Sequence, residues 1–249
     1  MTETTDFTPG GYRTIPAVFQ YSAGVAALPG FEIRRVRFRA PVPLAQGFAR
    51  IERFITAAGR PLTSFCACEL RSPAPWNDAG FRAFNERYVV TLEKWNVSDG
   101  KLNPVARSNV CPEIDPPSEP SFHAFSFTVQ AVNTQPTFVI SGSAEARPGD
   151  APYDQRTVRH GEATADAMRE KAQYVLGVME RRLALLGFTW TDTTATQVYT
   201  VHNVFPFLGD EIVRRGAARA GLTWHFNRPP VRDLDYEMDC RGVVTELVI

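Results

Sequence analysis

The chain has 249 residues, 44% of them hydrophobic and 22% charged, which is enough for one large domain or two smaller ones with a sizeable core. Its 27 basic and 27 acidic residues balance, so the charge gives no indication of nucleic-acid or anionic-membrane binding. No apolar run approaches the roughly 18 residues of a membrane-spanning helix, and the polar N-terminus does not resemble a signal peptide. We therefore expect a cytoplasmic protein.

In chain order, a polar tail that we expect to be disordered (residues 1–14) precedes a hairpin-like region at residues 19–40. An amphipathic helix follows and ends at Gly59, where a left-handed glycine cap is expected. The segment Ser64 to Leu70 is typical of a strand, and a second helix begins at Trp76-Asn77-Asp78. An extended segment, SFHAFSFTV, then completes the series.

The same order of elements recurs in the second part of the chain. A hairpin-like region over 121–146 is followed by an amphipathic helix that ends at Gly187, a strand from Ala195 to Val201, a helix after Asn203, and the extended segment LDYEMDCRGVV. The order ββαβαβ therefore occurs twice, and we expect two halves, residues 15–117 and 118–249. This order predicts an α+β fold with helices on one face of mixed sheets.

The four cysteines have no zinc-site spacing and are expected to be buried free thiols. The sequence also has no GxGxxG, no P-loop and no set of histidines spaced for a metal. We therefore expect neither a metal nor an organic cofactor.

Four motifs, FVISGSAE, AFNERY, NPVARSNV and DLDYEMDC, together with the order of elements, resemble the RidA/YjgF family of enamine/imine deaminases. The resemblance covers nearly the whole chain, once per half, and is weaker where RRVRFRA begins the first half. It implies a tandem duplication of the chorismate-mutase-like unit. Single-unit members are trimers, so a homotrimer of the tandem chain is expected.

The resemblance also implies roles for individual residues. Arg107 in PVARS corresponds to the arginine that binds the substrate carboxylate, and Asn85 in FNERY to a common asparagine of the second helix. Ser141 and Gly142 form the Ser-Gly turn that helps to hold substrate. Glu237 in YEMDC corresponds to the glutamate proposed to position the hydrolytic water.

Each half keeps only part of this set. The first half has His123 in the place of the glutamate, and the second half has Trp224 near the place of the arginine and Gly209 in that of the asparagine. We therefore expect one composite site that draws on both halves. His123 is either a substituted acid/base or a core histidine, and Trp224 is a candidate for an apolar substrate wall.

Taken without the resemblance, these residues have ordinary structural interpretations. Arg107 is then a solvated loop charge, and Glu237 lies on the exposed face of an alternating strand. Ser141 merely ends a strand, and Asn85 is a polar residue on a helix surface.

The chemistry that the resemblance implies is hydrolytic deamination of a small enamine or imine carboxylic acid, giving a keto acid and ammonia. A planar arginine suits the carboxylate, and a positioned acid/base activates water. A 2-aminomuconate-like product of aromatic ring cleavage is a plausible substrate. The alternatives are a chorismatase-like hydrolase and a non-catalytic module that binds small acids or partner proteins.

Overall fold

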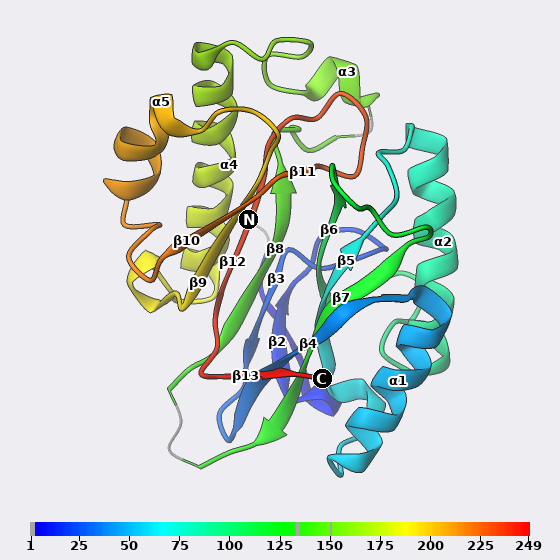
Figure 1. Cartoon of the computed structure of the whole chain (residues 1–249). Coiled ribbons are helices and arrows are strands. Elements are labelled where there is room, and N and C mark those ends of the chain that lie inside the picture. Colours follow the sequence, from blue (N-terminus) through cyan, green and yellow to red (C-terminus); the bar gives the residue numbers. More distant parts are fainter. Residues whose placement is uncertain (1–2, 133–134, 150) are drawn as a thin grey trace.

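The computed structural model describes residues 3–132, 135–149 and 151–249, and its strands form two sheets (Figure 1). The seven-stranded sheet runs β1 (Thr5–Phe7), β2 (Tyr12–Ile15), β3 (Gly24–Ala27), β8 (Phe138–Ala144), β12 (Glu237–Gly242), β9 (Ala195–Tyr199) and β10 (Leu222–His225). The six-stranded sheet runs β11 (Asn227–Arg228), β6 (Ala106–Pro112), β5 (Phe65–Arg71), β7 (Ser121–Gln130), β4 (Phe31–Pro43) and β13 (Thr245–Val248). Both sheets are mixed, because β5 pairs with β6 and β9 with β10 in parallel, whereas most other pairs are antiparallel.

Helices cover the outer face of each sheet, which confirms the expected α+β fold (Figure 1). α1 (Leu44–Ala57) and α2 (Asp78–Lys94) pack on the six-stranded sheet, and α4 (Ala165–Leu185) and α5 (Phe205–Phe207) on the seven-stranded sheet. A short α3 (Tyr153–Arg156) precedes α4, and a π-helical turn over Leu208–Val213 continues α5. A third apolar cluster, which includes Tyr12, Val25 and Ile33, takes side chains from both sheets.

The helix ends follow the sequence signals. Gly59 and Gly187 both have positive φ, 68° and 84°, just beyond α1 and α4, as the glycine caps predict. Asn77 caps α2 by accepting a hydrogen bond from the Gly80 N–H over 2.8 Å. All four cysteines are buried and free, as expected.

Neither expected hairpin forms. β3 and β4 are separated only by residues 28–30, yet β3 pairs with β2 and β8, and β4 pairs with β7 and β13. β7 and β8 also lie in different sheets. The chain thus crosses from one sheet to the other at both of these places, and β4, β7 and β8 find antiparallel partners far away in the sequence.

The first residues of the chain also differ from the expected disordered tail over 1–14, because β1 and β2 lie there. Tyr12 is 0% exposed and donates a hydrogen bond to the Phe65 carbonyl over 3.2 Å. Burial of this aromatic ring between the sheets offsets the entropy of ordering a polar segment.

No single cut of the chain separates the two sheets. β1 to β3, from the start of the chain, belong to the seven-stranded sheet, although the strands and helices that follow them build the six-stranded one. Conversely, β11 and β13, near the end of the chain, belong to the six-stranded sheet. The expected halves, 15–117 and 118–249, stay a prediction about sequence repeats.

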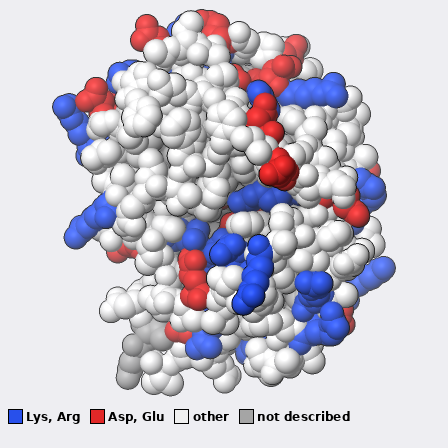
Figure 2. All heavy atoms as spheres, in the orientation of Figure 1, with Lys and Arg blue, Asp and Glu red and all other residues white. Residues whose placement is uncertain are grey.

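Acidic and basic side chains are interspersed on the face drawn in Figure 2, and basic ones gather near its middle. No helix in the described part of the chain is both long and apolar enough to cross a membrane.

Candidate active site

A cavity of about 1100 Å³ lies where β6 of one sheet meets β8 and β12 of the other, with α2 and α4 on its flanks. Arg107, Asn85, Gly142 and Glu237 all line it. A parallel backbone bridge between Ser22 and Ala106 joins the two sheets beside it. The fold therefore brings together residues from both parts of the chain that the motifs singled out.

Arg107 is not a solvated loop charge. It lies on β6, is 3% exposed, and donates from Nη2 to Oδ1 of Asn85 over 2.7 Å. Its guanidinium carbon is 4.7 Å from the ring centre of Tyr88, 5.0 Å from that of Tyr21 and 5.6 Å from that of Phe84, which is cation–π distance.

This arrangement leaves part of the guanidinium free. Nη1 of Arg107 is buried and has no hydrogen-bond partner within the described residues. No carboxylate among them lies within ion-pair distance of Arg107 either. A buried cation with an unused donor is costly unless a ligand pairs with it. The geometry therefore suits an anionic ligand.

Ser141 holds the two sheets together rather than facing the cavity. Its hydroxyl accepts the Arg107 backbone N–H over 3.0 Å and donates to the Ser22 carbonyl over 2.6 Å. Gly142, the next residue, lets the Glu237 carboxyl approach, because a Cβ on Gly142 would collide with Oε1 of Glu237.

Glu237 begins β12 and is 4% exposed. Burial is the main cause that raises its pKa well above the ordinary value, and the negative charges of Asp239 and Glu145 raise it further. Arg107 and Arg71 act in the opposite direction. Glu237 is therefore a carboxylic acid that keeps its proton to a higher pH than a free side chain does, and that can act as a proton donor.

His123 and Trp224 lie outside the residues that line this cavity. Burial, followed by the charge of Arg71, lowers the pKa of His123 to about 3, so its ring is neutral at pH 7. Trp224 lies on β10, is 37% exposed, and donates from Nε1 to the Thr200 carbonyl over 2.9 Å. The structure does not bring either residue to Arg107.

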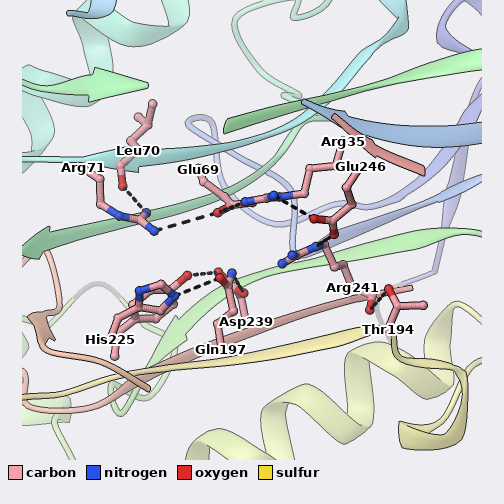
Figure 3. A network of polar contacts seen from close by, with 11 residues as sticks. Arg35, Glu69, Leu70, Arg71, Thr194, Gln197, His225, Asp239, Arg241 and Glu246 are labelled. Carbon is pink, nitrogen blue, oxygen red and sulfur yellow. Dashed lines mark hydrogen bonds and ion pairs between the residues drawn. The ribbon is translucent and has the colours of Figure 1, made fainter. Parts of the chain in front are cut away.

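His225 belongs to a polar network between the two sheets (Figure 3). Its Nε2 is 3.1 Å from Oε1 of Gln197, and Nε2 of Gln197 donates to Oδ1 of Asp239 over 2.7 Å. On the other side of this network, Arg35 pairs with Glu69 over 2.6 Å (Figure 3). These contacts fill the region near the second-half counterpart of Arg107 with polar side chains that pair with one another, although Nη2 of Arg71 has no hydrogen-bond partner among the described residues. Within the described ranges, no cluster of three or more His, Cys, Asp or Glu side chains is arranged to hold a metal ion.

Sequence reasoning missed Arg182 of α4, which also lines the cavity. Its Nη1 donates to the carbonyls of Ser141 over 2.9 Å and Gly142 over 3.4 Å. The signal was present, since Arg182 lies three positions after the buried Met179 and so near the inner face of the helix. An arginine at the edge of an apolar stripe is usually solvated, and the sequence pattern alone does not distinguish a solvated arginine from one that lines a cavity.

Solved structures that resemble parts of this chain include RidA from a Psychrobacter species and the YjgF gene product of Escherichia coli. The first is 15% identical, with a TM-score of 0.33 over 47% of this chain and 85% of the other. The second is 18% identical, with a TM-score of 0.32 over 43% of this chain and 80% of the other.

The sequence comparisons extend over nearly the full length. The 2-amino-5-chloromuconate deaminase of Comamonas testosteroni is 53% identical over 245 residues, which is 98% of each chain. The model of the family described as 2-aminomuconate deaminase CnbZ matches residues 4–247. The chain therefore belongs to the CnbZ family of 2-aminomuconate deaminases.

Proposed function

We propose that this protein is a hydrolytic deaminase that converts 2-aminomuconate, or a ring-substituted form of it, to the corresponding 2-oxo acid and ammonia. The observation that carries the proposal is the free Nη1 of Arg107, which is buried in a cavity that the Glu237 carboxyl also lines. Family membership and the 53% identity to a 2-amino-5-chloromuconate deaminase support the substrate class.

In this proposal, Arg107 binds the carboxylate next to the amino-bearing carbon. Asn85 already uses Nη2, and the rings of Tyr21 and Tyr88 restrain the guanidinium plane. Nη1 then donates to the carboxylate, which pairs the buried charge. The substrate is thereby fixed with its C2–N bond in the cavity, beside Glu237.

Glu237 supplies the proton transfers. The protonated carboxyl donates its proton as the enamine becomes a cationic imine, and the resulting carboxylate accepts a proton from the water that adds to C2. In the carbinolamine, the hydroxyl proton passes to the amino nitrogen through the Glu237 carboxyl, the C2–N bond breaks, the C2=O bond forms and ammonia leaves. The net change consumes one water and leaves Glu237 protonated.

Ser141 and Gly142 take part in no chemical step and instead position Arg107 and Glu237. The Ser141 hydroxyl fixes the backbone of Arg107, and Gly142 gives the Glu237 carboxyl its space. His123 and Trp224 have no part in the proposed steps.

We also propose that the chain assembles as a homotrimer in the cytoplasm. Exposed aromatic side chains near β10, Phe205, Trp224 and Phe226, give a surface that self-association would bury. Light scattering after size-exclusion chromatography measures the assembly directly, and a mass of one or two chains would contradict the trimer.

The activity is tested with 2-aminomuconate produced enzymatically in situ. We expect stoichiometric ammonia release and loss of the conjugated enamine's ultraviolet absorbance, both well above the spontaneous rate. Arg107→Gln and Glu237→Gln should each lower the enzymatic rate by at least about 10²-fold while leaving the circular dichroism spectrum unchanged. Wild-type ammonia release at the spontaneous rate would refute the proposal.

A further inference from the structure

The cavity holds a second cation, Arg182, in addition to Arg107. No described carboxylate lies within ion-pair distance of Arg182, and both hydrogen bonds that its Nη1 makes go to carbonyl oxygens. Carbonyls orient a guanidinium but do not neutralise its charge. Of the acidic residues that line the cavity, Asp78 is exposed at the start of α2, and Glu237 has a raised pKa.

The other arginines of the cavity are either occupied or exposed. Arg82 pairs with Glu86 over 3.1 Å on the surface of α2. Arg156, like Arg182, donates only to carbonyls, but these belong to its own loop, and its guanidinium stacks on the Tyr153 ring, away from Arg107 and Ser141. Arg181 is exposed. Arg182 is therefore the cavity cation without a carboxylate partner that is bound to the Ser141–Gly142 backbone, next to Arg107.

Arg107, on β6 of the six-stranded sheet, and Arg182, on α4 against the seven-stranded sheet, both contact Ser141. The Arg107 backbone N–H donates to the Ser141 hydroxyl, and Arg182 donates to the Ser141 carbonyl. Tyr21 lines the same cavity as both arginines, and its ring is 5.0 Å from the Arg107 guanidinium carbon. Two cations without carboxylate partners that line one cavity suit a ligand with two negative ends.

We propose that Arg182 binds the second carboxylate of the substrate, the one distant from the amino group, and so selects dicarboxylates over monocarboxylates. The inference rests on the proposed function, because 2-aminomuconate carries a carboxylate at each end of its conjugated chain. Arg107 holds one end and Arg182 the other, and Glu237 faces the reacting carbon beside Arg107.

The test uses two stable acids that differ at one end only. Muconate has two carboxylates, whereas sorbate has a methyl group in place of one of them. Calorimetric titration of the wild type should give at least about tenfold tighter binding of trans,trans-muconate than of sorbate. Arg182→Gln should remove most of this difference by weakening muconate alone, and Arg182→Lys should restore part of it because the charge returns.

Two further variants separate recognition from mere positioning. Arg107→Gln should weaken both acids, since both retain the carboxylate that Arg107 binds. Arg169→Gln, which removes a partly exposed arginine elsewhere on α4, should weaken neither. If Arg182→Gln weakens sorbate as much as muconate, Arg182 only supports the Ser141–Gly142 backbone and the proposal is overturned.

No change in muconate affinity on Arg182→Gln would overturn the proposal equally, as would a wild type that does not bind muconate. The deaminase activity is measured separately as ammonia release by the wild type. If the wild type releases ammonia but Arg182→Gln binds muconate as the wild type does, the proposed activity stands and only the role of Arg182 is refuted. If the wild type binds muconate selectively but releases no ammonia, the proposed deaminase activity is refuted.

Discussion

The Arg107 guanidinium and the Asn85 amide form a buried pair, with Nη2 donating to Oδ1 over 2.7 Å. Asn85 is neutral, so it orients the guanidinium and leaves its full charge for a ligand. The choice of an amide over a carboxylate at this position is therefore central to the proposed carboxylate site.

This relationship predicts different results for two substitutions of Asn85. Asn85→Ala leaves Nη2 without its partner, and loss of a hydrogen bond to a charged group should raise KM about tenfold or more. Asn85→Asp places a carboxylate against Arg107 and should raise KM further, because it competes with the substrate for the cation. Steady-state kinetics check this order, with the exposed Glu86→Gln on the same helix as a control. A lower KM for Asn85→Asp than for Asn85→Ala would contradict it.

Glu237→Gln should separate activity from stability. It removes the proton donor, so kcat should fall about 10²–10⁴-fold. The raised pKa of Glu237 means that the folded chain holds a proton that the unfolded chain releases above about pH 4.5. Stability is therefore lost as pH rises from that value towards the folded pKa. Because glutamine cannot ionise, the variant should melt at a higher temperature than the wild type at pH 7.

The two proteins should melt alike near pH 4, where both folded and unfolded carboxyls are largely protonated. Calorimetric melting curves across this range test the sign. A wild-type protein that gains stability relative to Glu237→Gln as pH rises would show that the carboxylate, not the acid, is favoured in the folded state.

The sequence was informative where a residue's role depends on its own motif. The glycine caps at Gly59 and Gly187 follow from local signals, whereas the site positions of Arg107 and Glu237 follow only from the resemblance of their motifs to a known family. The sequence does not show which sheet β3 or β4 joins. The alternation of apolar and polar residues in these strands fits any antiparallel partner with a matching face. The contribution of Arg182 was hidden for a similar reason, since its surroundings come from β8, more than 35 residues away in sequence.

Gly142→Ala tests the close approach of Glu237 to β8. The added Cβ would collide with Oε1 of Glu237, so the carboxyl must move, and a displacement near 1 Å costs about 10² in rate. Overpacking should also cost about 1–3 kcal/mol in the free energy of unfolding. Kinetics and urea titration measure the two effects.

Gly177→Ala provides the matched control. Gly177 lies within α4, where the nearest atom to a new Cβ is Arg181 Nη1 at 3.4 Å. Alanine favours a helix interior, so this change should stabilise the fold by up to about 1 kcal/mol and leave kcat unchanged. Equal effects of the two substitutions would argue against a specific contact between Gly142 and Glu237.

A buried ion network sets the start of β12, just before Glu237. Nζ of Lys171, on α4, donates to Oε1 of Glu145 over 3.2 Å and to Oδ2 of Asp235 over 2.6 Å. The Glu145 carboxylate also accepts the backbone N–H groups of Asp235 and Tyr236. The network thus fixes the two residues that precede Glu237.

Lys171→Met removes the ammonium group that pairs with both carboxyls, and it leaves Glu145 with two backbone N–H groups and Asp235 with His202 at 3.0 Å. Breaking a buried pair on one side typically costs about 3–5 kcal/mol, and urea unfolding should show a loss of that size. Arg169→Met, which breaks a partly exposed pair on the same helix, should cost under about 1 kcal/mol. Adding Glu145→Gln to Lys171→Met should recover part of the loss, since it removes one unpaired charge. In Lys171→Met the start of β12 is held less rigidly, so kcat should fall by a larger factor than KM changes. Similar stability of Lys171→Met and Arg169→Met would show that the network does not hold β12 in place.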